Sequence, residues 1–184
     1  SDAFFVKLFR SETTEAWLDG HVSAFAWLGG VPLSILYDNS KRLVARINAD
    51  KSRTLTQAFA RLQCHSLFDA RLGRPASGND EGKVEGMVRY ARRNFMVPMP
   101  EGNSLDVLNA QMQTACDKRM AALLRSHGQS IGERHQADQA AFMSLPAVPF
   151  EACEEVSTKV SSQSLVRYRT NDYSVPTDYA YQTV

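Results

Sequence analysis

The sequence predicts an α/β protein in which part of the sheet is parallel. Segments with strand composition alternate with amphipathic helical segments, two long helices follow, and short β segments come at the end. Apolar residues make up 43% of the 184 residues and charged residues 22%, which is ordinary for a globular protein with a real core.

The first three elements are predicted from residue type and chain punctuation. Residues 3–9, AFFVKLF, are aromatic and aliphatic and predict a strand. The segment 12–29 shows helical spacing of apolar residues and ends at Gly29 and Gly30, which are typical of a helix C-terminus. Residues 33–38 then predict a second strand.

The middle of the chain continues the alternation. Thr54 and Gln57 form a capping-box pattern and predict a helix start, a short strand is expected within 67–72, and 74–80 reads as a loop. Another helix is expected from near Asp80. Its predicted buried stripe consists of apolar residues at helical spacing: Val84, Val88, Ala91 and Phe95.

The last part of the chain changes character. Ser104 is expected to begin another long helix, and the polar residues 126–136 are interpreted as a loop, with a short helix after it. From about residue 147 the pattern predicts two or three short β segments around an Asn-Asp turn at 171–172.

Composition narrows the classes of function. The net charge of +1 gives no global basic field, so any affinity for nucleic acid must come from local patches. The three cysteines are widely spaced and include no C-x-x-C pair, which favours free thiols and offers no support for zinc. No apolar run approaches the roughly 20 residues that span a bilayer. The four histidines show no ligand spacing, and His21 is predicted to be a packed core residue.

Two carboxylates stand out as candidate site residues. Asp38 ends the strand SILY, and Glu85 lies early in a predicted helix, one position after Val84. Sites in open α/β sheets form at such strand ends. The simpler interpretations are a turn at Asp38, and for Glu85 a surface pair with Arg89 or an interaction with the helix dipole. Spacing alone leaves the choice open.

Four segments carry a family resemblance. LYDNSK at 36–41 and GNDEGKVEGMVRYARRNF at 78–95 resemble the second-Asp and Glu motifs of DDE transposases of the IstA type. Residues 12–32 resemble the helix that these proteins place beside those strands, and 166–176 resemble the opening of their C-terminal β-barrel. These transposases are members of the retroviral-integrase-like superfamily.

The resemblance implies an α/β, RNase H-like core that lacks its first two strands, followed by a helical extension and the start of a small β-barrel. The expected division is a partial integrase catalytic core at 1–100, the helical extension at 101–146, and a linker with the truncated barrel at 147–184. The missing strand pair is expected to leave a sheet edge unpaired.

The resemblance also implies a chemistry. Asp38 and Glu85 become the second and third catalytic acids and ligands of two Mg²⁺ or Mn²⁺ ions, for strand cleavage and strand transfer at insertion-sequence ends. The implied partners are DNA, further copies of the chain and an AAA+ ATPase helper, in the bacterial cytoplasm at the nucleoid and without a membrane. Basic residues near the two acids are candidate DNA contacts: Lys41, Arg42, Arg74, Lys83 and Arg89.

The family's first Asp has no counterpart. Asp2 precedes a strand that cannot be the family's first strand, and it is interpreted as an exposed terminal residue. We therefore expect the chain alone to be inactive. The alternatives are a non-catalytic DNA-binding or assembly module derived from a transposase, and a related nuclease that only hydrolyses DNA.

Overall fold

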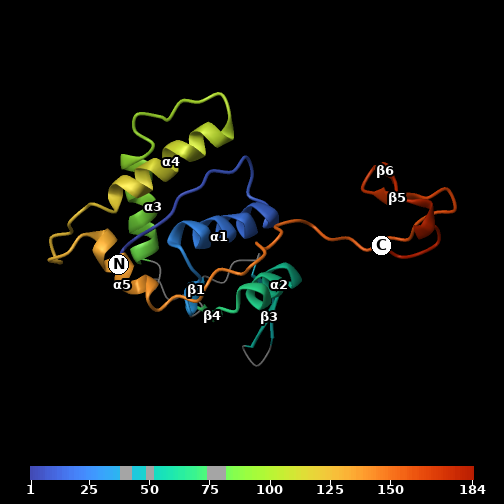
Figure 1. The fold of residues 1–184 in the computed structure, drawn as a ribbon, viewed down its shortest axis with the longest axis horizontal. Helices are drawn as coiled ribbons and strands as arrows, with labels where there is room; N and C mark the ends of the chain where they lie inside the picture. Colours follow the sequence, from blue (N-terminus) through green and yellow to red (C-terminus); the bar gives the residue numbers. More distant parts are fainter. Residues whose placement is uncertain (38–42, 49–51, 74–81) are drawn as a thin grey trace. The chain divides into compact units, whose positions relative to one another are not determined.

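The computed structural model describes residues 1–37, 43–48, 52–73 and 82–184 (Figure 1). It separates into two compact units, Ser1–Ala152 and Cys153–Val184. The described part is mixed α/β, as the sequence predicts. In chain order its elements are α1 (Thr14–Leu28), β1 (Ser34–Tyr37), β2 (Val44–Ile47), β3 (Arg53–Leu55), α2 (Gln57–Ser66), β4 (Asp69–Leu72), α3 (Gly82–Asn94), α4 (Leu105–Arg119), α5 (Ile131–Gln139), β5 (Leu165–Tyr168), β6 (Asn171–Ser174) and the 3₁₀ turn η1 (Thr177–Tyr179).

Capping residues set both ends of helix α1. The Thr13 hydroxyl accepts a hydrogen bond from the amide of Ala16, and Gly29 closes the helix in the left-handed region at φ 77°. A Cβ at Gly29 would lie 2.7 Å from the side-chain nitrogen of Gln139, so close packing also requires glycine there. The same Gln139 side chain donates to the carbonyl of Leu28 at 2.7 Å and ties α5 to the end of α1.

The predicted strand at 3–9 is wrong, because the segment is extended but pairs with no strand among the described residues. It runs between α1 and α4 in Figure 1. Its odd-numbered side chains face α1. Phe5 packs against Trp27 with ring centres 5.7 Å apart, and the ammonium of Lys7 lies 2.5 Å from the carboxylate of Asp19.

The segment also contacts α4. The guanidinium of Arg119 lies 4.9 Å from the ring centre of Phe4, and the side chain of Asn109 bonds both the amide and the carbonyl of Leu8, at 2.7 and 3.1 Å. An extended chain between two helices needs the same two-residue alternation as a strand in a sheet. The segment is therefore packed between two helices and not paired in a sheet of the described residues.

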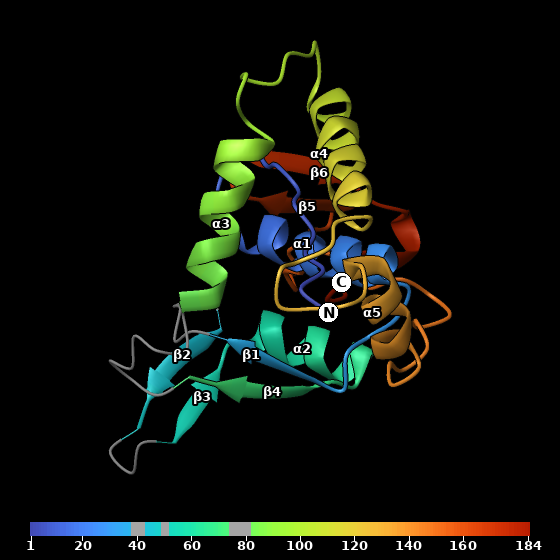
Figure 2. The ribbon, with the colours of Figure 1, turned by 90° about the vertical axis from the view of Figure 1, so that its left-hand side faces the viewer.

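Among the described residues of unit Ser1–Ala152, β1 and β4 form a two-stranded sheet and pair in parallel from Ser34 with Asp69 to Tyr37 with Leu72. This confirms the strands predicted within 33–38 and 67–72. Helices α1 and α2 lie on the same side of the pair (Figure 2). Side chains on the other side are open to solvent, with Leu36 56% exposed.

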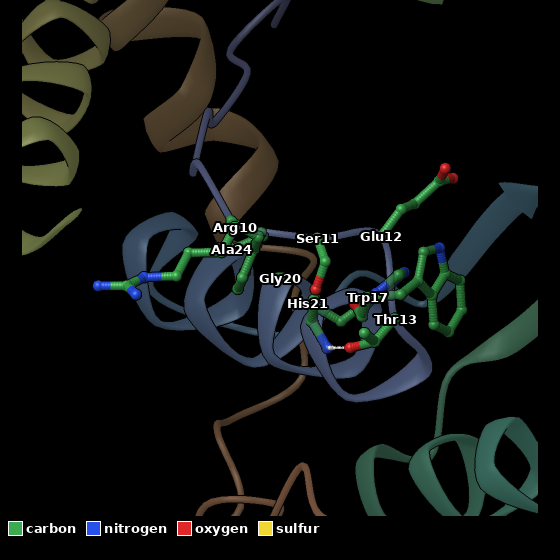
Figure 3. Close-up of a pocket in the computed structure, with 10 residues that line it drawn as sticks. Arg10, Ser11, Glu12, Thr13, Trp17, Gly20, His21 and Ala24 are labelled. Atoms are coloured by element: carbon green, nitrogen blue, oxygen red, sulfur yellow. Dashed lines mark hydrogen bonds between the residues drawn. The ribbon is translucent and has the colours of Figure 1, made fainter.

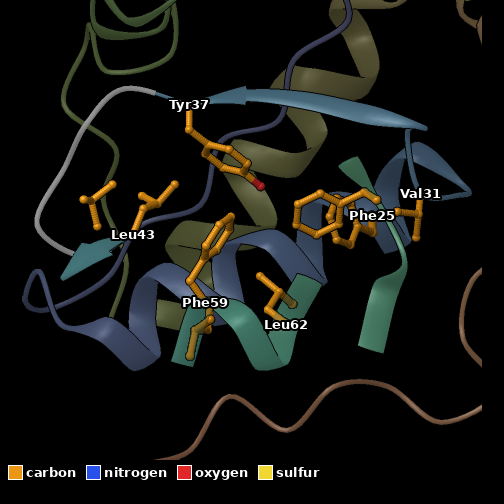
Figure 4. Close-up of a cluster of buried hydrophobic side chains, with 9 residues drawn as sticks. Phe25, Val31, Tyr37, Leu43, Phe59 and Leu62 are labelled. Atoms are coloured by element: carbon orange, nitrogen blue, oxygen red, sulfur yellow. The ribbon is translucent and has the colours of Figure 1, made fainter. Parts of the chain in front are cut away.

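The hydrophobic core lies under β1 (Figure 4). Phe59 of α2 is fully buried, and its ring centre lies 5.1 Å from that of Tyr37 and 5.6 Å from that of Trp17. The helix that carries Phe59 is the predicted one, but its cap differs: Thr56, rather than Thr54, accepts the amide of Phe59.

A short hairpin, β2 with β3, was not predicted. It pairs antiparallel from Val44 with Leu55 to Ile47 with Arg53, with an irregularity between Val44 and Arg46. Leu43 and Val44 are 1% and 8% exposed, so the hairpin adds to the core beside β1. This burial attaches Leu43 and Val44 to the core.

Helices α3 and α4 confirm the predicted ones, and Ser104 caps α4 as expected. In the predicted stripe of α3, Ala91 is 5% exposed, but Val88 is 46% exposed and does not belong to it. The predicted loop at 126–136 is wrong for its second half, because α5 begins at Ile131. None of the described helices is long and apolar enough to cross a membrane.

A capping box starts α5 despite its polar sequence. The amide of Glu133 bonds the Ser130 hydroxyl, while the amide and hydroxyl of Ser130 both donate to the Glu133 carboxylate, at 2.7 and 2.8 Å. Behind it, Ile131 is fully buried and His135 is 5% exposed. The apolar residues of this segment show too little helical spacing to predict a helix. The complete cap and the two buried side chains nevertheless stabilise one.

This cap predicts an acid-dependent loss of stability. The hydrogen bonds from Ser130 hold the pKa of Glu133 below its usual range. Stabilisation by the carboxylate is thus complete above its unfolded pKa, about 4.3, and is lost as the pH falls through the lower folded value. We expect Glu133→Gln, which removes the charge that both Ser130 donors bind, to lower the urea midpoint at pH 7 and to change it much less at pH 3. An equal change at both pH values, or a change in the exposed control Ser126→Ala, would contradict this explanation.

The unit Cys153–Val184 is a small β structure. Strands β5 and β6 pair antiparallel, Lys159 bridges to Thr183, and Val160 is 1% exposed at its centre. Short β segments are confirmed, but Asn171 and Asp172 lie in β6 and not in the turn. The described residues form a two-stranded sheet and not a closed barrel. The predicted division at residues 100 and 146 stays a prediction.

Candidate catalytic acids and nucleic-acid interface

The carboxyl ends of the two parallel strands meet at one edge of the sheet. Tyr37 and Leu72 are register partners, and the amide of Gly73 donates to the carbonyl of Tyr37 at 2.8 Å. Asp38 and Arg74, which follow directly in sequence, lie outside the described residues. The geometry therefore fixes where the chain leaves both strands, at the edge where open α/β sheets place their sites.

Glu85 lies in the first turn of α3 and is exposed. Arg89 is also exposed, and its position four residues later puts it on the same side of the helix. Lys83 belongs to α3, but its side chain is not among those described, and Lys41 and Arg42 lie outside the described residues. Of the predicted site residues, the structure thus presents Glu85 and Arg89 to solvent on one helix.

A metal site needs more donors than the described residues bring together. No group of three His, Cys, Asp or Glu side chains in the described part of the chain could hold a metal ion. The predicted ligand pair includes Asp38, which is outside that part. The donor chemistry of the pair, two carboxylates, matches the oxygen ligands that Mg²⁺ requires. The pairing of Asp38 with Glu85 stays a prediction.

Asp2 is not the exposed terminal residue that the sequence suggested. Its side chain is 26% exposed and lies 2.9 Å from a guanidinium nitrogen of Arg134 in α5, with the ring nitrogen of His127 at 3.8 Å. The carboxylate is therefore held by the guanidinium of Arg134 in a neighbouring helix. Periodicity within one segment carries no information about such a long-range pair.

A pocket of about 620 Å³ lies along α1 (Figure 3). Its floor is one face of the helix, where the small residues Ala16, Gly20 and Ala24 recur every fourth position. Trp17 and His21 line it as well. From the sequence this face was predicted only to be apolar, and the groove was missed. The four-residue spacing of small side chains could have indicated it.

His21 is a packed residue, as predicted. Its Nδ1 lies 2.8 Å from the carbonyl of Trp17, and its ring packs in a tilted arrangement with centres 4.0 Å from the ring of Trp17 and 5.6 Å from that of Tyr37. Burial lowers the pKa of His21, and the hydrogen bond to Trp17 offsets only part of that effect. The imidazole is therefore neutral near pH 7 and supports the aromatic packing beneath β1.

Known proteins that this chain matches belong to one class of protein. Residues 145–184 match the family model described as Mu transposase, C-terminal domain. The chain is 32% identical over 185 residues to the transposase for insertion sequences IS1326/IS1353 of Pseudomonas aeruginosa, covering 100% of this chain and 36% of that protein. These relatives place the chain in the transposase class.

Further relatives make the assignment more particular. A transposase of Aminobacter aminovorans is 31% identical over 186 residues, covering all of this chain and 36% of that protein. The transposase for insertion sequence element IS21 of Pseudomonas aeruginosa is 30% identical over 180 residues, covering 96% of this chain and 45% of that protein. The chain belongs with the IS21 and IS1326 transposases, and it spans less than half of the length of these relatives.

Proposed function

We propose that this chain forms part of the catalytic region of a DDE transposase, which cleaves and joins DNA strands at the ends of an insertion sequence. The observation that carries the proposal is the identity of 30–32% with transposases over essentially the whole chain. The arrangement of β1, β4 and α3 supports it, because these elements carry or adjoin both predicted acids.

The RNase H-like fold is the architecture that we propose for this region. Strands β1 and β4 supply a parallel pair with two helices on one face, and among the described residues no strand pairs with the other edge of β1. An unpaired edge of an apolar strand favours a further strand. In the full-length transposase we assign that edge to the opening strands of the core, which would carry the first catalytic Asp.

Asp38 and Glu85 would act as oxygen ligands for divalent ions. When bound, such ions would supply positive charge that stabilises the oxygens reacting at phosphorus. The role of this chain is to hold the carboxylates rigidly. Burial of Tyr37, the residue before Asp38, and the caps of the surrounding helices would supply that rigidity.

Cations near the acids would bind the DNA backbone. Arg89 is exposed on the side of α3 that carries Glu85, and Lys41, Arg42, Lys83 and Arg74 are close to the two acids in sequence. Phosphate contacts of this kind supply affinity without sequence readout. Assembly of several copies on the element ends and cooperation with an AAA+ helper, in the cytoplasm at the nucleoid, complete the proposal.

A joining assay on the full-length protein tests the proposal. The transposase is incubated with Mg²⁺, element-end DNA and a supercoiled target, and the products are separated as cleaved or joined strands. Metal-dependent joined products support a transposase. DNA binding without either product would favour the assembly module, and free ends without joining would favour a hydrolytic nuclease.

The chain alone is expected to be inactive in the same assay. It supplies two of the three acids, and a two-metal site with one ligand set incomplete holds its ions poorly. We expect joined product from the isolated 184 residues to stay at background at any Mg²⁺ or Mn²⁺ concentration, while the full-length protein reacts. Robust joining by the isolated chain would refute this expectation.

A further inference from the structure

Helix α3 is attached to the rest of its unit by an aromatic cluster around one guanidinium. Arg119, at the end of α4, lies 4.1 Å from the ring centre of Tyr90 and 4.9 Å from that of Phe4. The rings of Phe4, Tyr90 and Phe95 pack on one another with centres 5.7–6.0 Å apart. Three segments that are distant in sequence therefore meet at Arg119.

The cluster contacts the side of α3 that faces away from Glu85. Tyr90 follows Glu85 by five residues, which places it about 140° round a helix of 3.6 residues per turn. Glu85 is exposed, whereas Tyr90 is half-buried. A rotation or tilt of α3 about this attachment would therefore move the Glu85 carboxylate directly.

Arg119 is unsuited to the other roles open to a cation at a helix end. Its side chain is half-buried, and its Nε is buried with no hydrogen-bond partner among the described residues. Such an orphaned donor is costly, and the aromatic faces offset the cost through cation–π attraction. An arginine placed to contact DNA or only to complement the helix dipole would keep its guanidinium in water.

We propose that Arg119, acting through Tyr90 and Phe4, is a positioning residue that sets the orientation of α3 and hence of Glu85. The inference rests on the proposed function for its catalytic consequence, but the attachment itself is a property of this chain. The guanidinium joins α4 and the N-terminal segment to α3, so the helix behaves as part of one rigid unit.

Hydrogen exchange of the 184-residue chain tests the attachment without any activity. We expect Arg119→Met and Tyr90→Leu to accelerate exchange of the α3 amides at least about fivefold, the scale of a desolvated cation–π contact. Tyr90→Phe keeps the ring and should change exchange less than about twofold. The exposed Arg125→Met is the matched control and should leave α3 unchanged. Equal exchange in Arg119→Met and wild type would overturn the proposal.

Strand transfer in the full-length transposase tests the consequence. We expect Arg119→Met to lower kcat about tenfold or more, with KM for end DNA unchanged and with activity retained in Tyr90→Phe. If Arg119 only stabilised the fold, Arg119→Met would lower the fraction of active molecules. The burst amplitude and the observed rate would then fall by the same factor. If Glu85→Gln abolishes joining while Arg119→Met leaves kcat intact, the positioning role fails and the proposed function stands. If Glu85→Gln has no effect, the proposed function itself fails.

Discussion

Glu85→Gln in the full-length transposase is expected to lower strand transfer by at least about 10³-fold. The amide keeps the shape of the side chain but lacks the charge that holds a divalent ion, and the loss of several kcal/mol of charge stabilisation corresponds to several factors of ten in rate. Folding should be almost unchanged, because Glu85 is exposed in the first turn of α3. Joined product is measured against time at saturating Mg²⁺.

Two further variants complete the test. Asp38→Asn should have an effect of the same size, since both acids are proposed to hold the same ions. Glu101→Gln removes an exposed acid that lies between α3 and α4 and should leave the rate unchanged. Full activity in either Glu85→Gln or Asp38→Asn would contradict the assignment of the acids.

Phe59→Ala is expected to lower the free energy of unfolding by about 3–5 kcal/mol. Phe59 is fully buried, and its ring contacts Trp17, Tyr37 and Phe68, with the ring centre of Phe68 at 6.2 Å. The cavity would open beneath β1, where neighbouring rings can collapse only partly. Urea denaturation of the 184-residue chain followed by tryptophan fluorescence measures the change.

An exposed apolar residue provides the control for this variant. Leu33 precedes β1 and is 60% exposed, so Leu33→Ala should change the free energy of unfolding by less than about 0.5 kcal/mol. A loss of less than about 1 kcal/mol in Phe59→Ala would show that the core is packed elsewhere. A large loss in Leu33→Ala would indicate that its side chain is covered in solution.

Helix positions could be predicted because their signals are local. Thr13 and Ser104 cap the helices that they precede, and Gly29 ends α1 at positive φ, each through contacts within a few residues. The strand at 3–9 could not be judged in the same way. The segment contacts α1 through its side chains and α4 through the backbone of Leu8, which bonds Asn109 about 100 residues away, and no local pattern distinguishes that environment from a sheet.

Two other differences also have physical causes. Helix α5 begins with a complete capping box at Ser130 and two buried residues, which stabilise it although its sequence is polar. The hairpin of β2 and β3 is only four and three residues long, and its strands are held by burial of Leu43 and Val44 against the core. Packing against the rest of the unit therefore determines that both elements form.

The candidate site was likewise only partly predictable from the sequence. The sequence correctly placed Glu85 in the first turn of a helix, and the strand before Asp38 ends where predicted. Whether the two carboxylates converge depends on how α3 is held, and the described contacts of Tyr90 join this helix to Phe4 and to Arg119 of α4. That arrangement is a long-range property and could not be read from spacing.

Iron-directed cleavage of the full-length transposase bound to end DNA tests the central claim most directly. Fe²⁺ replaces Mg²⁺, ascorbate and peroxide generate hydroxyl radicals at the bound metal, and the cut positions in the protein are mapped by mass spectrometry. If Asp38 and Glu85 share divalent ions, cuts will cluster within a few residues of both positions and will disappear in excess Mg²⁺. Cuts near only one of them, or cuts that Mg²⁺ does not suppress, would contradict a shared metal site.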